Sequence, residues 1–136
     1  MADRDFINPP DLAPPAGYTQ AVSVGPGRTL YISGQVAYDK KGDIVGPGDL
    51  RKQAEQTYAN LEKALAAGGA TFEDVVKTTH YVVNYSSADL PVLREVRSRY
   101  FHPERPPANT LIGVQALARE GLLIEVEAVA VVSPAE

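Results

Sequence analysis

Residues 122–132 read LLIEVEAVAVV, an apolar stretch interrupted by two carboxylates. Side chains on a β-strand alternate between its two faces, so Glu125 and Glu127 project from the same face. The opposite face is wholly apolar and consists of Leu122, Ile124, Val126, Ala128 and Ala130. Burying an ionised carboxylate without compensation is costly. We therefore predict a strand with one face in a core, and with at least one glutamate lining a cleft or a subunit seam.

The composition favours one globular domain. The chain has 136 residues, of which 44% are hydrophobic and 22% charged, and it contains no cysteine. We predict a single domain over residues 1–136, with residues 1–17 as an extended, proline-rich arm. The absence of cysteine excludes disulfides, thiol catalysis and thiolate metal sites.

Charge and hydropathy bear on the partners and the compartment. No apolar run reaches the roughly 20 residues of a membrane helix, so we expect no membrane partner. The net charge of −4 disfavours nucleic acid. Arg94, Arg97 and Arg99 form the densest basic group, which we interpret as a solvated helix face. The N-terminus does not resemble a secretory signal, and we expect a cytoplasmic protein.

Turn residues divide the first half of the chain. Residues 19–24 alternate as a strand, Gly25-Pro26-Gly27 marks a turn, and residues 29–33 form a second strand, so we predict a hairpin. A helix begins near Asp49 and ends at Gly68-Gly69. Its predicted apolar stripe consists of Leu50, Ala54, Tyr58, Leu61 and Leu65.

The second half adds a helix and three strands. Residues 71–74 resemble a capped single turn, and the β-branched run 75–83 predicts a strand. Ser86 or Ser87 caps a second helix, in which Pro91 falls in the first turn. The loop 102–107 leads to the strands 109–114 and 122–132. This order predicts an α+β sandwich with both helices on one sheet face. A second copy of the chain is expected to cover the other face.

The sequence resembles the Rid family, also called the YjgF/YER057c/UK114 family. The matching stretches cover nearly the whole chain: residues 17–22 (GYTQAV), 31–35 (YISGQ), 77–79 (KTT), 107–108 (PA) and 124–128 (IEVEA). The resemblance implies a chorismate-mutase-like fold with a mixed sheet, and a barrel-like homotrimer with small-molecule sites in the clefts between subunits. It also implies, in one branch of the family, hydrolysis of imines and enamines such as 2-aminoacrylate.

Carried over from that branch, the cleft contains Tyr18, Ser33 and Glu125, together with an arginine directly after Pro-Ala. Here that position is Asn109, a neutral amide. In the family, this arginine binds the substrate carboxylate. Its loss is expected to weaken carboxylate binding roughly tenfold to a hundredfold. We therefore expect inefficient turnover of 2-aminoacrylate.

The remaining candidates have less direct roles. We expect Thr110 and Gly113 to contact the substrate beside Asn109, and backbone amides of residues 112–114 to polarise it. Arg105 is an alternative source of positive charge in the cleft. The competing interpretation is that Arg105 belongs to a surface loop and is solvated. Glu127 is interpreted as structural, with a lysine or a backbone amide as its partner.

Glu125 is the candidate that positions and activates water. The chain has two histidines, His80 and His102, neither of which has an acid at ligand spacing, so we expect no metal and no cofactor.

Three functions remain open from the sequence. The first is a deaminase-type hydrolase of a small imine, enamine or related C–N compound. The second is a small-metabolite binding or sensing trimer without catalysis, and the third is a structural role that leaves the cleft unused.

Overall fold

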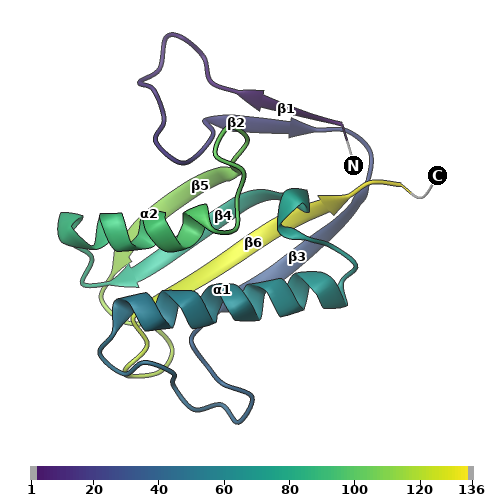
Figure 1. The fold of residues 1–136 in the computed structure, drawn as a ribbon. Helices are drawn as coiled ribbons and strands as arrows, with labels where there is room; N and C mark the ends of the chain where they lie inside the picture. The colour runs from purple at the N-terminus through teal and green to yellow at the C-terminus, as the bar shows by residue number, and fades with distance from the viewer. Residues whose placement is uncertain (1–2, 135–136) are drawn as a thin grey trace.

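A four-stranded sheet lies beneath two helices, and a separate two-stranded ribbon lies at one end (Figure 1). The computed structural model describes residues 3–134, so the ends of the predicted 1–136 domain lie outside the described residues. The elements in chain order are β1 (Arg4–Ile7), β2 (Ala21–Val24), β3 (Arg28–Gln35), α1 (Leu50–Ala67), η1 (Phe72–Asp74), β4 (Val75–Val83), η2 (Ser87–Asp89), α2 (Leu90–Ser98), β5 (Ala108–Val114) and β6 (Ile124–Val132).

The main sheet is mixed and has the order β3-β6-β4-β5. β6 pairs antiparallel with β3 and with β4, whereas β5 runs parallel to β4. Ile124, Val126 and Ala130 of β6 are fully buried against the helices, as the alternation predicted. The predicted α+β sandwich, with two helices on one sheet face, is confirmed.

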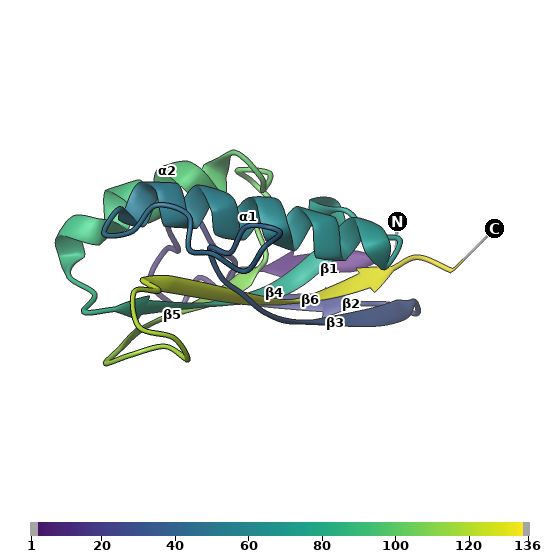
Figure 2. The same ribbon diagram turned by 90° about the horizontal axis from the view of Figure 1, so that it is seen from below.

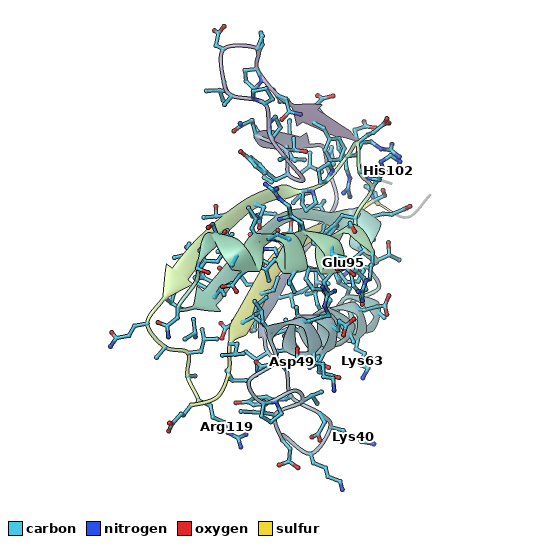
Figure 3. The ribbon with its side chains drawn as sticks, turned by 60° about the vertical axis from the view of Figure 1, so that its left-hand side comes forward. Lys40, Asp49, Lys63, Glu95, His102 and Arg119 are labelled. Atoms are coloured by element: carbon cyan, nitrogen blue, oxygen red, sulfur yellow. The ribbon has the colours of Figure 1, made fainter. Side chains whose placement is uncertain are left out.

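Both helices cover the same face of the sheet, as Figure 2 shows. The side chain of Asp49, labelled in Figure 3, caps the first turn of α1 by accepting from the Lys52 amide at 3.0 Å. α1 ends where Gly68 follows Ala67, so both predicted ends are confirmed. Its buried residues are Gln53, Ala54, Thr57, Tyr58, Leu61 and Leu65. α2 buries Leu93 and Val96.

A bulge near the start of β4 changes which side chains reach the open face. Val75 is buried, and strict alternation from it would place Lys77 in the core. The register shifts between Val75 and Lys77, however, and the buried positions are then Thr78, His80 and Val82. Because the bulge adds one residue, Lys77, Thr79 and Tyr81 face away from the helices.

The predicted hairpin between residues 19–24 and 29–33 is wrong. β2 pairs antiparallel with β1 of the N-terminal arm, and β3 pairs instead with β6. The arm is held in place by Arg4, whose guanidinium donates to the carbonyls of Glu73 at 2.6 Å and Val131 at 2.8 Å. The Gly-Pro-Gly link between β2 and β3 thus joins two different sheets instead of closing a hairpin.

Candidate functional site

The sheet face without helices carries a band of polar and charged side chains. A hollow of about 460 Å³ lies over it. The residues that line it are Tyr31, Ile32, Ser33, Lys77, Thr79, Glu127, Ala128 and Val129. They come from β3, β4 and β6, so the mixed sheet itself brings together segments that are far apart in sequence.

Glu127 is paired within this face. Its Oε1 accepts a hydrogen bond of 2.6 Å from the Tyr81 hydroxyl, and this bond raises the pKa of Tyr81. The Lys77 ammonium donates to Thr110 Oγ1 at 2.8 Å and to the Thr78 carbonyl at 3.1 Å. Partial burial lowers the pKa of Lys77, and the charge of Glu127 opposes that effect. The partner of Glu127 is therefore a tyrosine hydroxyl instead of the predicted lysine or backbone amide.

Glu125 lies on the same face, opposite Tyr81 in the register of β4 and β6. A side chain at Gly34 would collide with the Glu125 carboxylate, so glycine at this bulge in β3 leaves room for it. Glu125 accepts no hydrogen bond from any side chain or amide of residues 3–134. Half-buried and without such a partner, it is free to accept a proton or a hydrogen bond from a bound molecule.

Asn109 belongs to a different environment, under the helices. Its Oδ1 accepts from Thr78 Oγ1 at 2.9 Å and lies 2.6 Å from His80 Nδ1. The other ring nitrogen of His80 is 2.6 Å from the Tyr58 hydroxyl. Burial lowers the pKa of His80 to about 4, so the ring is neutral near pH 7. A neutral ring that donates from Nδ1 and accepts at Nε2 satisfies both bonds.

The other predicted residues fall in several places. Ser33 and Thr110 are on the open face with the glutamates. Gly113 packs against Tyr85, and Tyr18 is half-buried just before Thr19, which forms a bridge with Ala108 at the start of β5. Arg105 lines a hollow near Phe6 and Phe72, away from the residues around Glu127. The structure thus groups four candidates on the open face: Ser33, Thr110, Glu125 and Glu127.

Two polar residues of this face, Lys77 and Tyr81, were not among the predicted site residues. The signal that could have found them is the pairing of β4 with the acidic strand, because it sets Tyr81 opposite Glu125 and Thr79 opposite Glu127. This pairing could be recognised only with knowledge of the bulge in β4. Among the residues that the structure describes, no three His, Asp or Glu side chains gather as metal ligands would. Over the same range, no helix has the length and apolarity to cross a membrane.

Comparisons with known proteins agree with this architecture. The family model described as endoribonuclease L-PSP matches residues 9–132. A 2-iminobutanoate/2-iminopropanoate deaminase of Dermatophagoides farinae is 31% identical over 133 residues, which cover 97% of this chain and 99% of the relative. The mouse protein of the same name is 39% identical, with coverages of 86% and 82%.

A solved structure is also similar. It is a protein of unknown function from Yersinia pestis, described as belonging to the conserved Rid protein family. It superimposes with a TM-score of 0.89 at 45% identity and covers 95% of this chain and 98% of that one.

Proposed function

This chain belongs to the Rid family, and on that premise we propose that it is a deaminase-type hydrolase of small imines, enamines or related C–N compounds. The observation that carries the proposal is the unpaired carboxylate of Glu125 on the open sheet face, beside a paired Glu127. The names of the relatives from Dermatophagoides farinae and mouse support imine hydrolysis as the reaction class.

The proposed reaction uses Glu125 as the base. Its carboxylate takes a proton from water while the oxygen of that water adds to the imine carbon, and it returns this proton to the imine nitrogen, which becomes the amine of a carbinolamine. Glu125 then takes the hydroxyl proton of the carbinolamine as the C=O bond forms and delivers it to the nitrogen as the C–N bond breaks, so that ammonia leaves and Glu125 is again a carboxylate. One imine and one water give one carbonyl compound and one ammonia.

The site is proposed to lie at a seam between subunits of a homotrimer. Two large apolar side chains of the open face, Tyr31 and Ile112, are 79% and 39% exposed. Large exposed apolar side chains beside a hollow are typical of a surface that another molecule covers. Closure by a neighbouring subunit would also exclude bulk water from Glu125 and so enclose a small ligand.

The substrate is proposed to be neutral or weakly acidic. Asn109 stands where the imine deaminase branch has its arginine, and its oxygen is committed to Thr78 and His80. The cation among the residues lining the hollow is Lys77, whose ammonium already contacts Thr110 and lies near Glu127. A carboxylate substrate would therefore lack the planar, two-pronged partner that a guanidinium provides.

A test compares two imines at equal concentration. One is 2-iminopropanoate, generated in situ by an amino-acid oxidase, and the other is the uncharged imine of benzaldehyde, generated in situ from benzylamine by a flavin amine oxidase. Turnover is measured as the increase in the rate of hydrolysis over the uncatalysed rate. We expect kcat/KM for the neutral imine to be at least about tenfold higher than for the carboxylate. Equal or greater turnover of the carboxylate would contradict the substrate proposal. Binding without turnover of either imine would favour a sensing trimer.

A further inference from the structure

A second hollow lies on the helix side of the molecule, remote from Glu125. Its volume is about 540 Å³, and it is bounded by α2, by the loop that follows it and by the segment before β2. Its lining consists of Ala16, Gly17, Arg94, Arg97, Ser98, Phe101, His102, Pro103 and Pro106. His102, labelled in Figure 3, lies beyond the end of α2 at this loop.

Arg97 is the unusual residue of this hollow. Its side chain is half-buried, yet within residues 3–134 it makes no ion pair or hydrogen bond. Arg99, two residues further on, contacts Glu55 at 2.6 Å and Glu95 at 3.1 Å. Arg51 likewise contacts Glu95 at 2.6 Å. The same helix region therefore contains acids that pair with arginines, and Arg97 is turned away from them.

The local environment of Arg97 makes its positive charge unfavourable. Burial lowers the pKa of Arg97, Tyr58 opposes that effect, and the neighbouring charge of Arg94 acts in the same direction as burial. A cation held partly out of water beside a like charge is unfavourable unless an anion compensates it. No acidic side chain is among the residues that line the hollow, so an anion bound there would compensate the charge of Arg97.

Gly17 makes space for the guanidinium. The residue has φ +78, and a Cβ there would clash with Arg97 Nη2, so a larger residue would push the arginine out of position. Close contact between Arg97 and the backbone at Gly17 limits the orientations of the planar group. A guanidinium fixed in this way is suited to two parallel hydrogen bonds with a carboxylate.

From this arrangement we propose that the hollow between α2 and the 101–106 loop binds a small organic carboxylate with an apolar body. Arg97 holds the carboxylate through two hydrogen bonds, and Arg94 adds a second positive charge at the rim. Phe101, Pro103 and Pro106 contact the carbon skeleton. The apolar lining favours such a ligand over inorganic phosphate, which offers no surface for these three side chains.

The experiment measures benzoate binding to the full chain by calorimetry, with benzamide as a neutral analogue and inorganic phosphate as a competing anion. Benzoate is expected to bind at least about tenfold more tightly than either. Arg97→Gln is expected to weaken benzoate binding at least about tenfold, and Arg94→Gln about threefold. The matched control is Arg99→Gln, which removes one positive charge from the same region and is expected to change affinity less than about twofold.

Thermal unfolding supplies a second readout besides calorimetry. Because Arg97 is an uncompensated charge, Arg97→Gln is expected to unfold at the same temperature as the unmodified protein or higher. Benzoate should raise the unfolding temperature of the unmodified protein and not that of the variant.

Three results would overturn the proposal. The first is the absence of benzoate binding at about 10 mM. The second is equal loss of affinity in Arg97→Gln and Arg99→Gln, which would assign the effect to net charge. The third is tighter binding of phosphate than of benzoate, which would leave an anion site but not one for an organic carboxylate.

Discussion

The two faces of the sheet differ in how completely their polar side chains are hydrogen-bonded. Beneath the helices, Tyr58, His80, Asn109 and Thr78 form a closed network in which the side chains satisfy one another. On the open face, Glu127 is paired with Tyr81, whereas Glu125 is left without a partner from residues 3–134. A buried polar group without a partner is costly, so polar residues of the covered face serve stability. On the open face, the carboxylate of Glu125 remains available to a bound molecule.

The largest effect expected on the open face concerns assembly. Native mass spectrometry of the unmodified protein should give close to three times the 14.6 kDa chain mass. The double variant Tyr31→Asp, Ile112→Asp places two charges in the proposed seam and should weaken association more than about a thousandfold, giving monomers.

The control for assembly is Leu12→Asp. Leu12 is 51% exposed and lies in the arm, so the variant should remain a trimer. A monomeric unmodified protein, or a double variant that stays trimeric, would contradict an interface on the open face.

The next largest effect tests the covered face. Asn109→Leu removes the acceptor of both Thr78 and His80, and should lower the free energy of unfolding by about 3 kcal/mol because two buried donors lose their partner. Urea denaturation measures this change. Gln115→Ala, at an exposed position just after β5, should change stability by less than about 0.5 kcal/mol. Equal effects of the two variants would mean that the network contributes little.

The pH dependence of stability tests the same network without altering Asn109. Burial lowers the pKa of His80 from 6.5 to about 4, so below 6.5 the unfolded chain binds a proton before the folded protein does. Stability from this residue is therefore present above pH 6.5 and is lost as the pH falls toward 4. Between pH 7.5 and pH 5 the expected loss is about 2 kcal/mol.

The control for this pH effect is His80→Phe, measured by urea denaturation at both pH values. It should show a smaller loss than the unmodified protein, since the exposed His102 and the carboxylates are common to both chains. Identical losses would show that His80 is accessible to protons in the folded state.

The smallest expected effect concerns the paired glutamate. Glu127→Gln should lower the free energy of unfolding by about 1 kcal/mol, because the bond from Tyr81 loses its charged acceptor on a partly solvated face. Tyr81→Phe and the double variant complete a cycle by urea denaturation. Their coupling energy is expected to be positive and below about 1.5 kcal/mol, and a coupling of zero would remove the proposed structural role of Glu127.

Local patterns in the sequence predicted much of the fold. The apolar alternation of β6, the caps of α1 and the β-branched run of β4 each depend on neighbouring residues, and their positions are confirmed. The partner of β2 was mistaken because the Gly-Pro-Gly turn signal does not specify which strands pair. β1 is also anchored by contacts of Arg4 with the distant carbonyls of Glu73 and Val131, which no local pattern contains.

The candidate site was predictable only where strict alternation holds. Glu125 and Glu127 were assigned to one face from β6 alone, but the bulge in β4 concealed Lys77 and Tyr81. Asn109 was predicted to replace a family arginine, whereas its bond to His80 depends on the parallel pairing of β4 and β5. The three arginines near α2 were interpreted together, yet Arg99 pairs with acids and Arg97 lines a hollow.

The most direct test of the catalytic claim is the turnover of Glu125→Gln in the imine assay, measured beside Glu127→Gln. If Glu125 activates water on the open face, Glu125→Gln should lose at least about a hundredfold in kcat while it keeps its assembly and ligand affinity, because the amide retains the shape and loses the base. Glu127→Gln should retain most of its turnover. Unchanged turnover in Glu125→Gln would contradict the account.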